Sequence, residues 1–185
     1  AAASGSMGNR LWVADLGSAM QPDLAARPVA VAPEEDAFYT PLGVVGKTLY
    51  LYTTYQAPRG RVVALTIGET DRAKWRTVVP ETKDVIDEGG TALVGDHISV
   101  VYLADVQSRV RLFALDGTPK GEIALPEPGS VSGLQGRNDG RELYFSFTSF
   151  LRPATVYRYD FKSGTSTAFH PPISPFDASK YETRA

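Results

Sequence analysis

The chain contains no cysteine among its 185 residues, and it has only two histidines. Without cysteine, neither a disulfide nor a thiolate metal site can form within it. An excess of positive charge is missing too, because 19 Lys and Arg residues are outnumbered by 21 Asp and Glu residues. A nucleic-acid binder needs a basic face to displace counterions from phosphates, so this balance argues against nucleic acid as a partner.

Long apolar runs are also missing. No segment approaches the roughly 20 apolar residues that cross a bilayer, so we expect no membrane partner. Residues 1–8 read Ala-Ala-Ala-Ser-Gly-Ser-Met-Gly and lack the basic flank and apolar centre of a signal peptide. We interpret them as a flexible native segment or as a remnant of cloning. A chain without cysteine fits the cytoplasm or the periplasm, and we favour the cytoplasm.

Helical periodicity is almost absent, and short strand-like runs take its place. Runs rich in Val, Leu, Tyr, Phe and Thr alternate with Gly, Pro, Asp and Asn, which predicts strands joined by tight turns. Glycine supplies the positive φ that such turns need. The clearest hairpin turns lie at Gly46-Lys47, Gly95-Asp96, Asp116-Gly117-Thr118 and Lys162-Ser163-Gly164.

The strand pattern repeats along the chain. Similar segments centre on Trp12, Val63, Leu112 and Tyr157, at steps of 51, 49 and 45 residues. A second strand class starts at Leu49, Val100 and Leu143, at steps of 51 and 43 residues. Units of about four strands with a period of about 40 to 50 residues are typical of β-propeller blades. A β-sandwich is the alternative, but a sandwich need not repeat its sequence.

We therefore predict an all-β fold, a partial β-propeller of about three and a half four-stranded antiparallel blades. The expected units are a half blade over 9–33, blades over about 37–81, 84–126 and 129–170, and a linker over 171–185. The expected fourth strands are 29–31, 76–79, 122–125 and 167–169. Each blade buries apolar faces against two neighbours, so an array of this size leaves end faces exposed and indicates a missing portion.

Several segments in fixed order resemble one family. They are Asn9-Arg10-Leu11-Trp12, Lys74-Trp75-Arg76, Leu103-Ala104-Asp105-Val106, Gly129-Ser130-Val131 and Tyr144-Phe145-Ser146-Phe147-Thr148-Ser149-Phe150-Leu151. Together they resemble the later blades of the propeller of the prolyl oligopeptidase (prolyl endopeptidase) family, of bacterial type. The tail Phe176–Thr183 resembles the junction at which that family's chain leaves its propeller for the hydrolase domain.

The resemblance implies a parent serine peptidase that cleaves short peptides after proline. Its seven-bladed propeller would cap an α/β-hydrolase domain that carries Ser, Asp and His, and would restrict entry to the active site. This chain would be the C-terminal half of that propeller, with 171–185 leading toward an absent hydrolase domain. The implied partners are the rest of the peptidase and short peptides. The alternative is a stand-alone binding or interaction module in which a second copy of the chain closes a ring.

Catalytic residues are not evident in the sequence. No Gly-x-Ser-x-Gly elbow is present, and Gly129-Ser130-Val131-Ser132-Gly133 has valine at its centre. His97 follows a turn, as a surface residue at the start of a strand would, and His170 precedes Pro171-Pro172 in the expected linker. We therefore assign no catalytic, cofactor-binding or metal-binding residue, and we expect no cofactor and no peptidase activity from this chain alone.

Three other patterns favour structural interpretations. Pro41–Thr48 mimics a phosphate-binding loop, but proline replaces its first glycine and a strand follows where the motif needs a helix. The carboxylate groups Glu34-Glu35-Asp36 and Asp84 with Asp87-Glu88 lack calcium-loop spacing, and we expect them in solvated loops. Asp105 would pair with Arg109 or Arg111 across a turn.

The aromatic residues Tyr144, Phe145, Phe147 and Phe150 could stack on nucleic-acid bases. Without a basic surround, we expect them to pack between blades instead.

Overall fold

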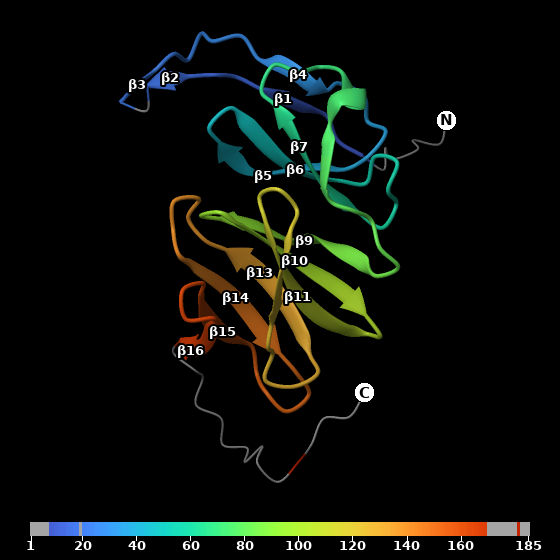
Figure 1. Ribbon diagram of the computed structural model, residues 1–185, viewed down its shortest axis with the longest axis vertical. Coiled ribbons are helices and arrows are strands. Elements are labelled where there is room, and N and C mark those ends of the chain that lie inside the picture. The colour runs from blue at the N-terminus through green and yellow to red at the C-terminus, as the bar shows by residue number, and fades with distance from the viewer. Residues whose placement is uncertain (1–7, 19, 170–180, 182–185) are drawn as a thin grey trace, which may run out of the picture.

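The computed structural model describes residues 8–18, 20–169 and 181 of the chain. The predicted all-β partial propeller is confirmed, because sheets follow one another along the length of the molecule (Figure 1). A half blade comes first, in which β1 (Leu11–Val13) pairs antiparallel with β4 (Val29–Ala32). Between them lies a short hairpin, β2 (Gly17–Ser18) and β3 (Gln21–Pro22), which the strand pattern did not predict.

Three four-stranded antiparallel sheets follow, each with its strands in chain order. The first blade contains β5 (Tyr39–Val45), β6 (Thr48–Thr53), β7 (Arg61–Thr66) and β8 (Arg76–Val79). The second blade contains β9 (Val85–Val94), β10 (His97–Ala104), β11 (Gln107–Ala114) and β12 (Pro119–Ile123). The third blade contains β13 (Ser130–Gln135), β14 (Glu142–Thr148), β15 (Thr155–Asp160) and β16 (Thr165–Phe169).

One strand position differs from the expectation. The fourth strand of the second blade was expected at 122–125, but β12 begins at Pro119 and ends at Ile123. Pro126 has no N–H to donate to a strand ladder, so the ladder ends before it. The only helix in the described ranges is the 3₁₀ turn η1 (Arg72–Lys74), and nothing there is a helix long and apolar enough to cross a membrane.

Apolar side chains fill the three seams between neighbouring blades. Tyr39, Leu51 and Val63 belong to the cluster between the half blade and the first blade. Tyr102 belongs to the next cluster, and Phe145 to the last. These five side chains are almost wholly buried, so each seam is packed like the core of a small domain.

The strands define two faces of the array. First strands β5, β9 and β13 all begin on the side that we call the entry face, where the links from the preceding blade arrive. They end on the opposite side, the turn face. The last strand β16 ends on the entry face, because Phe169 pairs with Val156 beside the β14–β15 connection.

Candidate functional site

The first strands of the three blades form one inner wall. Each of β5, β9 and β13 is the edge strand of its sheet, and β9 lies beside both of the others. Each also contains a β-bulge, located between Pro41 and Gly43 in β5 and between Ser132 and Gln135 in β13. Bulges and edge strands leave backbone N–H and C=O groups without ladder partners. The wall can therefore present polar backbone to a passing peptide.

A hollow of about 310 Å³ lies along this wall toward the turn face. That size is at the lower end of the range for small-ligand sites. Its lining comes from all three first strands and from the β13–β14 connection: Pro41, Leu42, Thr91, Ala92, Leu93, Leu134, Gln135, Gly136 and Asn138.

The β13–β14 connection at Gly136–Gly140, which we call the strap, closes one side of this hollow. It is a braced turn, because Gly140 N donates to the Arg137 carbonyl over 2.8 Å. The Arg137 guanidinium also holds the Asp139 carboxylate with two hydrogen bonds of 2.9 Å. These hydrogen bonds and the charge of Arg137 keep the pKa of Asp139 below its usual value. The strap therefore has a defined shape although it is exposed.

The base of the strap is fixed to the second blade. The Asn138 carbonyl accepts a 3.0 Å hydrogen bond from Gly95 N in the β9–β10 turn. Gly136 lies so close to Val94 that a Cβ on it would come within 2.4 Å of Val94 Cγ2. Only glycine fits this approach, so the sequence commits the strap to lie against β9.

The tip of the strap reaches one blade further. A Cβ on Gly43 in β5 would lie 2.5 Å from Nδ2 of Asn138 and 3.1 Å from its Cγ. The strap thus starts in the third blade, crosses the end of the second and rests its Asn138 side chain on the first. No hydrogen bond between the Asn138 amide and β5 is present in the described part of the chain, so this last contact is steric.

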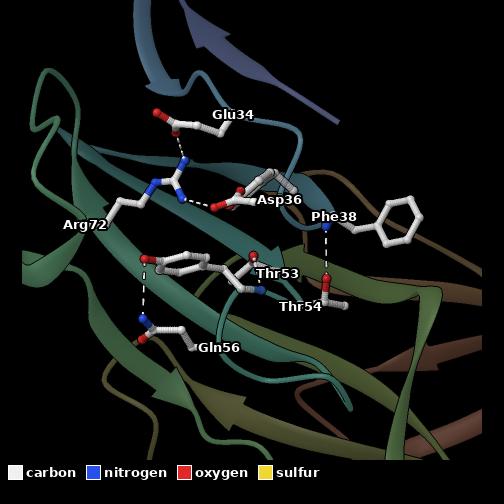
Figure 2. A network of polar contacts seen from close by, with 9 residues as sticks. Glu34, Asp36, Phe38, Thr53, Thr54, Gln56 and Arg72 are labelled. Atoms are coloured by element: carbon white, nitrogen blue, oxygen red, sulfur yellow. Dashed lines mark hydrogen bonds and ion pairs between the residues drawn. The ribbon is translucent and has the colours of Figure 1, made fainter. Parts of the chain in front are cut away.

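A second polar cluster fastens the first blade to the link that enters it (Figure 2). Arg72 in η1 donates from Nη1 to Asp36 over 2.7 Å and from Nη2 to Glu34. Its guanidinium also lies 4.7 Å from the centroid of the Tyr55 ring and 5.5 Å from that of Tyr39. The arginine therefore combines charge-assisted hydrogen bonds with cation–π contacts.

Asp36 is the acceptor at the centre of this cluster. The Tyr39 hydroxyl donates to Asp36 Oδ1 over 2.5 Å, opposite the bond from Arg72. Burial raises the pKa of Asp36, but hydrogen bonds from Tyr39 and Arg72 outweigh burial and leave that pKa below its usual value. Burial and the bond to Asp36 raise the pKa of Tyr39. The cluster holds a fixed charge distribution at neutral pH.

A related contact between an arginine and a carboxylate occurs in each of the next two blades. In the second blade Arg111 contacts Asp84 over 3.3 Å, and in the third Arg152 contacts Glu127 over 3.1 Å. In each case the carboxylate lies in the link that enters the blade, and the arginine comes from a later segment of that blade. We call these three contacts the link clips. Their repetition indicates a structural role in fixing how each blade starts.

The sequence candidates for catalysis are dispersed. His97 begins β10 and is half-buried, with Nδ1 2.7 Å from Asp96 and its ring stacked at 4.3 Å on Phe161. Those partners orient a histidine but supply no nucleophile. Ser130 begins β13, and Lys47 lies in the β5–β6 turn. His170 and the tail Phe176–Thr183 fall outside the described residues, apart from Tyr181.

Two expectations about surface carboxylates are wrong. Asp105 forms no ion pair within the described ranges, because the turn holds it at φ 50° while Arg111 turns to Asp84 and Glu122. Asp84 was expected in a solvated loop, but its side chain is only 12% exposed. Asp36 does lie in an exposed loop, as expected, with its side chain 39% exposed, and its carboxylate is held there by Arg72 in the first link clip.

The aromatic run is divided between two environments. Phe145 and Phe147 are buried in the seam between the second and third blades, as expected. Tyr144 faces the other side of the sheet, where its ring meets that of Phe169 edge-on. Phe150 is 99% exposed in the β14–β15 connection, so the expectation that it packs between blades is wrong.

Sequence reasoning missed the strap and the first link clip. The two glycines that bracket Arg137–Asp139 are a signal for a tight connection, but the contact with Gly43 joins residues 95 positions apart. Arg72 has no distinctive neighbour in the sequence. Its role depends on partners between 17 and 38 residues away, which only the folded chain brings together.

Comparison with known proteins places this arrangement in one family. Residues 1–172 match the family model described as prolyl oligopeptidase, N-terminal beta-propeller domain. The prolyl endopeptidase of Elizabethkingia miricola is 29% identical over 185 residues, which cover 97% of this chain and 24% of that protein. The prolyl endopeptidase of Elizabethkingia meningoseptica is 29% identical over 180 residues, with the same coverage. The chain therefore spans about a quarter of the length of these relatives.

Solved structures agree. A structure from a study of two prolyl endopeptidases superposes with a TM-score of 0.84 at 31% identity, over 95% of this chain and 25% of that one. Prolyl oligopeptidase B from Galerina marginata superposes with a TM-score of 0.78 at 20% identity, over 93% of this chain and 24% of that one. The second likeness concerns the fold alone.

Proposed function

This chain belongs to the prolyl oligopeptidase family, as part of its N-terminal β-propeller domain, and from that membership we propose that it limits which peptides reach a serine peptidase active site. The bond after proline would be cleaved by another part of the peptidase, which lies outside the segment that this chain matches in its relatives. The preferred substrates would be short peptides that contain proline. The chain itself would act as a filter by size.

The observation that carries this proposal is the strap on the inner wall. A molecule that passes along the wall meets the steric contact between Asn138 and Gly43 beside a hollow of about 310 Å³. An extended peptide has a small cross-section, whereas a folded protein is far wider than such a hollow. Steric selection of this kind needs no catalytic group in the filter.

The entry face is where we place the rest of the peptidase. The last strand β16 ends on that face, and residues 171–185 would serve as the linker. Val106 and Phe150 lie there in the β10–β11 and β14–β15 connections, and both are almost completely exposed. These two side chains would become buried where the rest of the peptidase packs against the entry face.

An experiment on a grafted enzyme tests this function. In the grafted enzyme, this chain replaces the segment that it matches in the Elizabethkingia miricola prolyl endopeptidase. We expect it to cleave a short chromogenic peptide that contains proline and to leave a folded protein with the same cleavage sequence intact. Similar relative rates on the two substrates would overturn the proposal. The isolated chain should hydrolyse neither.

A second candidate function is self-association of the chain, favoured by its exposed ends. In the described residues β1 pairs only with β4, and Trp12 and Val29 of this half blade are each 45% exposed. Two copies could cover such surfaces and close a ring. Light scattering on the purified chain tests this, because a stable monomer at high concentration would exclude it.

A further inference from the structure

We propose that the strap Gly136–Gly140 is the element that sets the largest peptide able to pass along the inner wall, with the Asn138–Gly43 contact as its closed position. This inference rests on the proposed function.

The attachment of the strap is unequal along its length. Its base is held by the hydrogen bond from Gly95 to the Asn138 carbonyl and by the packing of Gly136 on Val94. Its tip rests on β5 through the Asn138 side chain without a hydrogen bond in the described part of the chain. Lifting the tip breaks no polar bond to the first blade, and the polar bond to the second blade that it gives up is the one from Gly95 to the Asn138 carbonyl, so opening costs about one hydrogen bond.

The internal brace makes the strap move as one piece. The double hydrogen bond between Arg137 and Asp139 and the turn bond from Gly140 to Arg137 lie wholly within it. Motion is therefore expected at its two ends, where glycines 136 and 140 stand. Glycine has no side chain, so positions 136 and 140 can absorb the φ and ψ changes that such a hinge needs.

The receiving surface on β5 is shaped for the tip. Gly43 has no side chain, and a Cβ there would collide with the Asn138 amide. The neighbouring bulge between Pro41 and Gly43 removes regular pairing with β6 at this point. The first blade thus offers a bare stretch of backbone to the strap, and any larger residue at position 43 would hold the tip away.

A disulfide across this contact would lock the strap closed. The Cβ built on Gly43 lies 3.1 Å from Asn138 Cγ, the atom whose place a cysteine sulfur would take. The distance from one Cβ to the partner's sulfur in a disulfide is about 3 Å, given its bond lengths and angles. The chain has no cysteine, so Gly43→Cys with Asn138→Cys would introduce the only pair.

The locked variant is tested in the grafted enzyme with a series of peptides of increasing length around one proline site. After oxidation, we expect the rate on the longest peptide that the parent cleaves to fall by about tenfold or more. The rate on a dipeptide-sized substrate should stay unchanged. Reduction should restore the original profile. Asn138→Cys alone serves as the control because it cannot form the bridge, whereas Gly43→Cys alone should hold the tip away and raise the length limit.

The opposite change opens the wall. Deletion of Arg137–Asp139 removes the tip, and we expect the deletion variant to cleave peptides longer than the parent accepts. The undeleted grafted enzyme, measured on the same peptide series, is the reference for this shift. In the locked variant of the preceding paragraph, a thiol assay before and after reduction verifies that the disulfide has formed.

The outcomes separate this inference from the proposed function. An enzyme that still excludes folded protein, but whose length limit ignores both the disulfide and the deletion, would overturn the role of the strap and leave the filter standing. An enzyme that cleaves short and folded substrates alike would overturn the filter itself. Opposite shifts of the length limit in the locked and deleted variants would establish the strap as its determinant.

Discussion

Arg72 donates a 2.7 Å hydrogen bond from Nη1 to Asp36, and this bond ties the β7–β8 connection to the link that enters the same blade. Related contacts, Arg111 of β11 with Asp84 and Arg152 of the β14–β15 connection with Glu127, fix the entries to the next two blades. A blade buries its faces against its neighbours, so its orientation depends on where its first strand begins. The link clips fix the position at which each first strand begins, through contacts between an arginine and a carboxylate.

Replacement of Arg72 by methionine should weaken the first link clip while it keeps most of the apolar stem. The side chain of Arg72 is 15% exposed, and its loss leaves Asp36 without its cationic partner. We expect the free energy of unfolding to fall by about 1–2 kcal/mol, the usual cost of losing a partly buried charged hydrogen bond and a cation–π contact. The measurement is a urea unfolding curve at neutral pH.

The matched control for that experiment is Lys74→Met in the same 3₁₀ turn. Lys74 binds Glu69 over 2.9 Å, but this pair is exposed and should contribute nothing that the unfolding curve resolves. If the two variants lost the same stability, the special role of Arg72 would be refuted.

Acid should weaken the same link clip through Asp36. Its pKa is lower in the folded chain than in the unfolded chain, so the folded state binds the proton less readily. The stabilisation is therefore complete above the unfolded pKa of about 3.9 and is lost as the pH falls through the lower folded value. Asp36→Asn should destabilise the chain at neutral pH. The difference in free energy of unfolding between this variant and the parent should shrink with acidification. Urea midpoints over a pH series measure this.

Tyr39→Phe provides the companion variant for the pH series. It removes the hydroxyl that donates to Asp36, so the pKa of Asp36 should rise and the acid loss should begin at higher pH. If the urea midpoints of Asp36→Asn and the parent differed by the same amount at every pH, the role of the Asp36 carboxylate in acid unfolding would be contradicted.

The seam between the first and second blades should be sensitive to a single methyl group at Gly117. A Cβ there would lie 2.3 Å from the carbonyl oxygen of Val78 in β8, and the residue has φ 97°. Two hydrogen bonds from Arg76 to the carbonyls of Leu115 and Asp116 hold the turn in this place. Gly117→Ala should therefore lower the unfolding free energy by about 1–3 kcal/mol, as overpacking does.

Gly121→Ala separates steric collision from backbone strain. Gly121 also has positive φ, at 111°, but nothing lies within 4 Å of its built Cβ. The alanine variant should therefore lose less stability than Gly117→Ala in the same thermal or urea measurement. Equal losses would indicate that backbone strain, and not the collision with the Val78 carbonyl, accounts for the loss at Gly117.

Most of the fold could be predicted from the strand pattern that repeats along the sequence. Segments around Val63, Leu112 and Tyr157 lie in the third strands β7, β11 and β15 of successive blades, as their spacing predicted. Strand order within a blade is local, because each pairs with the next one along the chain. Local pairing leaves a regular trace in sequence, and such a trace can be read without coordinates.

The candidate site could not be predicted in the same way. Asn138 and Gly43 lie in different blades, and the sequence around each indicates only a turn and a strand. The contact arises from the curvature of the array and from the close approach of Gly136 to Val94. Phe150 was misjudged for a related reason, because an aromatic residue after Phe145 and Phe147 continues the pattern although the strand has already ended at Thr148.

Phe150 on the entry face provides the last prediction. Its side chain is 99% exposed, so Phe150→Ser should leave the urea midpoint of the isolated chain unchanged. In the grafted enzyme the same change should lower the midpoint, because we place the rest of the peptidase against this face. Met20→Ser is the matched control, since Met20 is 90% exposed on the half blade, away from the β14–β15 connection.

The comparison between the two variants decides the question. Burial of one large apolar side chain in an interface contributes about 1.5–3 kcal/mol, which is well within the resolution of an unfolding curve. A loss in the grafted enzyme for Phe150→Ser but not for Met20→Ser would place the docking surface at the β14–β15 connection. If both variants had the same urea midpoint as the parent grafted enzyme, the proposal that Phe150 packs against the rest of the peptidase would be refuted.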